Sequence, residues 1–104
     1  MGDFNLEHRF PMAKDDARAR LQALGEYLHN KHGLSVSWSG DSASVSGRYL
    51  VVAIEGTMTV AEGVVRFSGK DPGFLFRAKA KEYLEYKLKT YLDPAKTLEQ
   101  LPRR

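Results

Sequence analysis

The sequence predicts an α+β domain in the chain order β-α-β-β-β-β-α, with two helices packed on one face of a twisted antiparallel sheet. Three observations lead to this prediction. Residues 12–31 and 74–92 place apolar side chains with the 3.6-residue period of a helix. Between them, residues 34–69 alternate apolar and polar side chains in short segments, as half-buried strands do. The connections are shorter than the dozen or so residues that a parallel crossover needs, so neighbouring strands should be antiparallel.

The first strand is expected over residues 3–10, DFNLEHRF, where apolar and aromatic side chains alternate with polar ones until Pro11 ends the pattern. The first helix follows, from about Met12 to Lys31. Its apolar residues fall in a narrow arc of the helical wheel: Ala17, Leu21, Leu24 and Leu28. Two aspartates in its first turn favour the helix dipole, and Gly33 supplies the expected C-terminal stop.

The strand region contains one segment without alternation, YLVVAI, from Tyr49 to Ile54. We interpret Gly47 as a break between strands, so that YLVVAI lies within one strand that is apolar on both sides. Both sides would then need cover. A strongly curled sheet, a homodimer packed sheet to sheet, or a cavity for an apolar ligand would each provide it.

The last predicted helix, from about Phe74 to Leu92, combines aromatic residues with many lysines. An apolar arc that includes Phe76, Tyr83 and Leu88 covers one broad side, as in a helix that faces a core. Its cations are scattered around the wheel: Arg77, Lys79, Lys81, Lys87 and Lys89. A mixed-sign face directs no particular partner, so we predict a core helix with solvated charges and rank nucleic-acid binding last. At its start, Phe74 to Phe76 cannot all face one way, so at least one side chain should cap the sheet or lie exposed.

The predicted core combines residues of both helices and of the sheet: Leu21, Leu24, Leu28, Val36, Trp38, Val52, Ile54, Phe67, Leu84 and Leu88. With 104 residues, the chain has the size of one domain, which we place at residues 1–94. Residues 95–104 are predicted to be a weakly ordered C-terminal tail.

The composition argues against most kinds of chemistry. The chain has no cysteine, so disulfides, thiolate metal sites and a cysteine nucleophile are excluded. Three histidines without well-placed acidic partners predict no metal site. No phosphate loop or nucleophile elbow is present. We therefore expect no catalytic residues, no cofactor and no enzymatic activity.

The N-terminal residues lack an apolar run, and the longest such run in the chain is far shorter than the ~20 residues of a membrane span. A soluble cytoplasmic protein without a transmembrane segment is therefore expected. The net charge of +3 is weaker than that of most nucleic-acid-binding domains.

With the elements placed, the segment HRFPMAKDDARARLQALGEYLHNKHGLSVSWSGDSASVSG resembles the bacterial family of polyhydroxyalkanoic acid system proteins, also described as granule-region proteins. The resemblance runs through His8, Ala17, Leu21, Leu24, Trp38, Gly40 and Asp41, and through the closing segment PGFLFRAKAKEYLEYKL. It covers residues 4–93, and the extension after Asp93 departs from the pattern. The resemblance implies a small bacterial protein associated with polyhydroxyalkanoate storage-granule genes, located in the cytoplasm or at granules, and it transfers no catalytic residue.

We therefore predict a non-enzymatic accessory or binding protein that uses an apolar sheet surface for self-association, as a homodimer, or for a hydrophobic polymer or granule partner. The alternative is a domain of helix-grip type that binds a small apolar ligand between a curved sheet and the last helix. The candidate partner or ligand surface comprises Trp38, Tyr49, Val51, Phe74, Phe76 and Tyr83.

Overall fold

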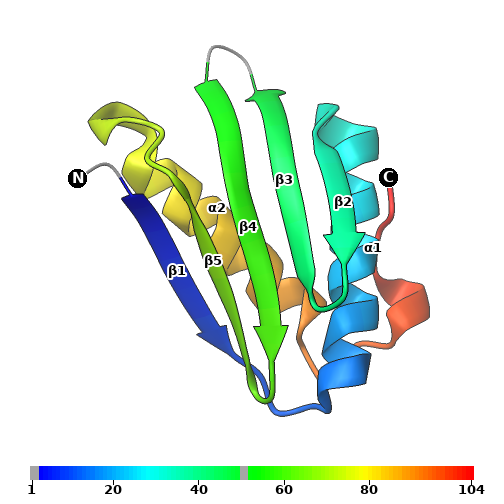
Figure 1. Cartoon of the computed structure of the whole chain (residues 1–104). Helices are drawn as coiled ribbons and strands as arrows, with labels where there is room; N and C mark the ends of the chain where they lie inside the picture. Colours follow the sequence, from blue (N-terminus) through cyan, green and yellow to red (C-terminus); the bar gives the residue numbers. More distant parts are fainter. Residues whose placement is uncertain (1–2, 50–51) are drawn as a thin grey trace.

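The computed structural model describes residues 3–49 and 52–104, and it contains the predicted order of elements (Figure 1). The elements are β1 (Asp3–Arg9), α1 (Lys14–His32), β2 (Ser35–Ser39), β3 (Ser42–Tyr49), β4 (Val52–Ala61), β5 (Val64–Lys70), α2 (Phe74–Tyr91) and a short 3-10 helix, η1 (Leu98–Gln100). The α+β fold class predicted from the sequence is confirmed.

The five strands form one open antiparallel sheet in the order β1-β5-β4-β3-β2. The first strand of the chain therefore pairs with the last one, and β1 and β2 are the edges. Figure 1 shows both helices on the same side of the sheet: α1 lies along the β2 edge, and α2 crosses the sheet diagonally. The helices therefore cover one face, which we call the inner face.

The segment YLVVAI is not one strand. β3 continues through Gly47, which pairs with Ile54, and ends at Tyr49, which pairs with Val52 at the start of β4. The segment thus contains the ends of two antiparallel strands that meet in a hairpin, and the interpretation of a single strand with two apolar sides is wrong. Leu50 and Val51 lie outside the described residues.

The inner face of the sheet carries the apolar residues of the alternating pattern, and the helices bury them. Its fully buried members include Phe4, Leu6, Ala43, Val45, Met58, Val60 and Val65. The outer face, over the residues that the structure describes, is polar. Its exposed residues include Ser35, Ser37, Ser39, Ser44, Ser46, Thr57, Thr59, Arg66 and Ser68.

Most of the predicted core lies where the sequence placed it. Leu21, Leu24, Leu28 and Leu88 are buried. The other predicted members are partly buried: Val36, Trp38, Val52, Ile54, Phe67 and Leu84. The partly buried group lies at the β2 edge or beneath the first half of α2, where the helices cover the sheet less completely.

The segment after α2 packs along α1 and is anchored by Arg20, a buried cation. The guanidinium of Arg20 donates hydrogen bonds to the carbonyls of Tyr91, Asp93 and Lys96, at 3.3, 2.8 and 2.6 Å. Its Nε also lies 3.1 Å from the carboxylate of Asp16. Such charge-assisted bonds satisfy carbonyls beyond the last helical turn, which have no partner within the helix.

Apolar and hydroxyl contacts extend this anchor to the end of the chain. Leu101 is buried in the core, and the hydroxyl of Tyr91 donates a hydrogen bond to the carbonyl of Pro102. Burial, with a smaller contribution from Tyr27, raises the pKa of Tyr91 to about 12, so this hydroxyl remains a donor at neutral pH. The sequence predicts weak order for residues 95–104. The structure gives these residues a defined path along α1, and hydrogen exchange can measure how mobile they are.

Candidate functional site

The two halves of α2 differ in how they meet the rest of the protein. In the second half, Leu88 and Tyr91 are buried against the core. In the first half no residue is buried, and Phe74 and Leu75 are 79% and 72% exposed. The second half therefore packs as the predicted core helix, whereas the first half contacts the core through the partly buried Ala80 and is otherwise exposed.

A cavity of about 370 Å³ lies between the first half of α2 and the inner face of the sheet. Its sheet side is formed by Phe4, Val45, Val52, Ile54, Met58 and Phe67, its helix side by Phe76, Ala80, Tyr83 and Leu84, and its side wall by Leu24, Leu28 and Leu34. These side chains are almost all aliphatic or aromatic. The volume falls within the range of ~300 to 1,000 Å³ found for small-molecule pockets.

Gly56 of β4 shapes the sheet side of this cavity. A Cβ atom at this position would lie 2.6 Å from the ring of Phe67, so the missing side chain is what allows the ring to lie against the backbone of β4. Phe67 also meets Phe4 edge to face, with ring centroids 6.1 Å apart. The aromatic pair thus lies on the sheet surface and leaves space beneath α2.

A polar pair borders the cavity at the side of α1. The Nε2 atom of His32 lies 2.9 Å from the hydroxyl of Tyr83, and the two rings meet edge to face. Burial, followed by the nearby charges of Lys31 and Lys87, lowers the pKa of His32 below its usual value. His32 is therefore neutral at neutral pH, and the pair adds no charge to the cavity.

Three charged residues lie on the cavity lining where the strands end and α2 begins: Glu55, Lys70 and Lys79. All three are exposed, and strand alternation directs the side chains of Glu55 and Lys70 to the outer face of the sheet. Lys79, on α2, can keep its charged head in water at the rim while its stem contacts the apolar interior.

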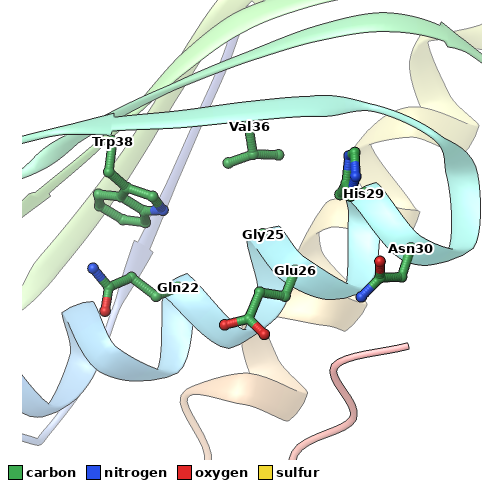
Figure 2. A pocket seen from close by; sticks show the side chains of 7 residues that line it. All are labelled: Gln22, Gly25, Glu26, His29, Asn30, Val36 and Trp38. Atoms are coloured by element: carbon green, nitrogen blue, oxygen red, sulfur yellow. The ribbon is translucent and has the colours of Figure 1, made fainter.

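A second hollow, of about 580 Å³, lies between α1 and the edge strand β2 (Figure 2). It is lined by Gln22, Gly25, Glu26, His29, Asn30, Val36 and Trp38. Figure 2 shows that Val36 and Trp38 reach from β2 towards α1. Gly25 allows this close approach, because a Cβ atom there would lie 3.0 Å from the Val36 side chain.

Three polar side chains of this hollow already serve the fold. Nδ1 of His29 lies 2.9 Å from the Leu34 carbonyl, and Asn30 donates to the Arg103 carbonyl at 2.7 Å. Glu26 forms an ion pair with Arg103 at 2.5 Å. These contacts hold the turn after α1 and the end of the chain, so we place the candidate site in the apolar cavity instead.

The residues predicted as a partner or ligand surface do not form one patch. Phe76 and Tyr83 line the cavity, whereas Trp38 lines the hollow beside α1 and lies 5.3 Å from the Arg18 guanidinium. Phe74 is exposed at the start of α2. Val51 and the side chain of Tyr49 lie outside the described residues.

The sequence reasoning missed the sheet side of the cavity, to which Phe4, Val45 and Met58 contribute. Strand alternation shows which residues point inward, but it does not show whether a helix covers them.

His8, on the inner face of β1, is a further titratable group on the covered side of the sheet. Burial lowers its pKa, and the nearby charge of Glu85 partly opposes this shift. Over residues 3–49 and 52–104, no group of three or more histidine, cysteine, aspartate or glutamate side chains is arranged to hold a metal ion. No helix in the described part of the chain is both long and apolar enough to cross a membrane.

Comparison with known families matches residues 4–95 to the family described as "Putative polyhydroxyalkanoic acid system protein". The chain belongs to this family. The match covers the sheet, both helices and the cavity between them, so the polyhydroxyalkanoic acid system family shares the whole domain and not one motif. No curated protein and no solved structure matches the chain.

Proposed function

We propose that this member of the polyhydroxyalkanoic acid system family is a non-enzymatic accessory protein that binds a small apolar chain in the cavity between α2 and the sheet. The observation that supports the proposal most directly is the cavity itself, about 370 Å³ in volume and lined by aliphatic and aromatic side chains. Polyhydroxyalkanoates are built of hydroxyacyl units, so a short acyl chain is the matching ligand. Of the alternatives raised by the sequence, this is the small apolar ligand of a helix-grip arrangement.

The position of α2 also supports ligand binding. Its first half contains no buried residue, whereas its second half is buried through Leu88 and Tyr91. A helix held at one end can adjust its distance from the sheet at the other end. A bound apolar ligand would remove its own surface and the apolar cavity walls from water. Each Å² of apolar surface removed from water contributes ~25 cal/mol to the binding free energy.

The test is calorimetric titration with 1-decanol, an uncharged ten-carbon chain. We expect saturable binding to the unmodified protein and loss of binding in Ala80→Phe, because Ala80 lines the cavity and a phenyl group would fill it. Ala78→Phe is the matched control, since Ala78 is exposed on the same helix and does not line the cavity. Equal binding by both variants, or no binding by the unmodified protein, would contradict the proposal.

Attachment to a polymer granule is a second candidate function. It is supported by Phe74 and Leu75, neighbouring apolar side chains that are exposed at the start of α2. We expect the protein to sediment with polyhydroxyalkanoate particles and the double variant Phe74→Ser/Leu75→Ser to remain in solution. Tyr86→Ser, which alters an exposed aromatic residue elsewhere on α2, should still sediment.

Self-association also remains a prediction. Because the described outer face is polar, a homodimer would form more readily at the free edges β1 and β2 than by sheet-to-sheet packing. Light scattering over a range of protein concentrations tests this directly. A mass of 11.7 kDa that does not change with concentration would rule the homodimer out.

A further inference from the structure

Lys79, on the cavity rim, differs from the cations of α2 that have a partner elsewhere in the protein. Arg77 is bound to Asp71 through two hydrogen bonds, of 3.0 and 2.5 Å. Lys87 lies over the ring of Tyr27, with its Nζ atom 4.1 Å from the centroid. Lys79 lines the cavity and forms no ion pair with any other residue whose side chain the structure describes. Lys81 forms none either, but it does not line the cavity.

The cavity rim therefore carries a positive charge at Lys79, because strand alternation directs the side chains of Glu55 and Lys70 to the outer face, with Thr57 and Arg66. The interior offers no compensating charge, because its polar side chains are those of Tyr83 and the neutral His32. An ionised group would lose several kcal/mol of hydration if it entered this interior. An anionic group of a ligand would consequently stay at the rim, within reach of Lys79.

An apolar interior with a cation at its rim suits a ligand that has an apolar chain at one end and an anionic group at the other. We infer that the cavity binds a single-chain amphiphile, such as a free alkanoic or hydroxyalkanoic acid, with its acyl chain inside and its carboxylate held by Lys79. This inference rests on the proposed function, because it specifies the chemical class of the ligand for the same cavity. It distinguishes a free acid from the uncharged polyester, in which the carboxyl groups are esterified.

The experiment compares decanoate with 1-decanol, which have the same chain length and differ in the charge of the head group. We expect decanoate to bind more tightly than decanol. Lys79→Gln should weaken decanoate binding roughly two- to fivefold, as expected for an exposed ion pair, and leave decanol binding unchanged. Raising the salt concentration should weaken the binding of decanoate alone.

Lys81→Gln is the matched control, since it removes the same charge from the same helix at a residue that does not line the cavity. If Lys81→Gln weakens decanoate binding as much as Lys79→Gln, the effect comes from general charge and the inference is overturned. Equal affinities for decanol and decanoate, unaffected by Lys79→Gln, would also overturn it while leaving the proposed function intact. Failure of both ligands to bind would overturn the proposed function and the inference with it.

Discussion

The Nε2 atom of His32, in the last turn of α1, lies 2.9 Å from the hydroxyl of Tyr83 in the middle of α2. This contact joins the two helices beside the cavity, at the point where α2 begins to separate from the sheet. The rings also meet edge to face, with centroids 5.9 Å apart. The pair therefore limits how far the first half of α2 can move.

The first prediction concerns this contact. Tyr83→Phe removes the hydroxyl, and we expect it to lower the free energy of unfolding by about 1 kcal/mol, the usual contribution of one hydrogen bond. The larger effect should be faster amide hydrogen exchange in the first half of α2, with little change around Leu88. Tyr86→Phe is the control, because Tyr86 is 65% exposed on the same helix. Identical exchange in the two variants would show that the contact does not hold α2.

The second prediction concerns pH. Burial lowers the pKa of His8 and of His32 below the value of 6.5 that they have when exposed. The unfolded chain therefore binds more protons than the folded protein around and below pH 6.5. The free energy of unfolding should be highest above pH 6.5 and should decrease as the pH falls through the lowered pKa values of the folded state.

Urea unfolding at pH 7.5, 6.5 and 5.5 measures this dependence. The variants His8→Gln and His32→Gln should each show a smaller decrease than the unmodified protein. A free energy of unfolding that stays constant over this range, or an unchanged slope in both variants, would contradict the assignment.

The third prediction concerns the anchor of the C-terminal segment. Arg20→Met keeps an apolar stem and removes the guanidinium, which leaves the carbonyls of Asp93 and Lys96 without this donor. We expect a loss of about 3 kcal/mol, as for a hydrogen-bonded buried charge, together with rapid hydrogen exchange after Pro94. Arg66→Met is the control, because its exposed pair with Glu7 contributes less than about 1 kcal/mol.

Hydrogen exchange on the unmodified protein also tests the weak order that the sequence predicts for residues 95–104. Slow exchange at Leu101, which is 4% exposed, would mean that the segment is a stable part of the domain. Exchange as fast in the unmodified protein as in Arg20→Met would mean that the anchor does not restrain it.

The fourth prediction concerns the sheet side of the cavity. Gly56→Ala places a methyl group where the ring of Phe67 now lies, at a distance of 2.6 Å that requires the ring to move. We expect a loss of about 1 to 3 kcal/mol and weaker decanol binding, since the displaced ring would enter the cavity. Thr57→Ala, on the exposed outer face, should change neither property. Unaltered stability of Gly56→Ala would show that Phe67 has space elsewhere.

The elements of the fold were predictable because their patterns are local. The arc of α1 and the alternation along β2, β4 and β5 each reflect one buried face. The hairpin between β3 and β4 was missed for a local reason as well: Leu50 and Val51, between the paired Tyr49 and Val52, lack the glycine, asparagine or aspartate that usually signals a turn. Gly47, the glycine that suggested a break, lies inside β3.

The cavity was only partly predictable, because it depends on distances between elements. Phe76, Ala80 and Leu84 would form the same apolar stripe whether α2 touched the sheet or stood away from it. The role of Arg20 depends on a contact with carbonyls more than 70 positions later in the chain. A basic residue in a helix pattern indicates a solvated face far more often than a buried anchor.

The pairing of β1 with β5 places the first strand beside one that ends 61 positions later, at Lys70. During synthesis on a ribosome, β1 therefore emerges long before its partner exists, and the apolar side chains of Phe4, Leu6 and Phe10 have no sheet to join. Contacts of such long sequence separation slow folding, because the chain between them must be ordered first. Each newly made copy thus passes through an interval in which an apolar strand is open to other chains, and the duration of that interval depends on the rate of translation.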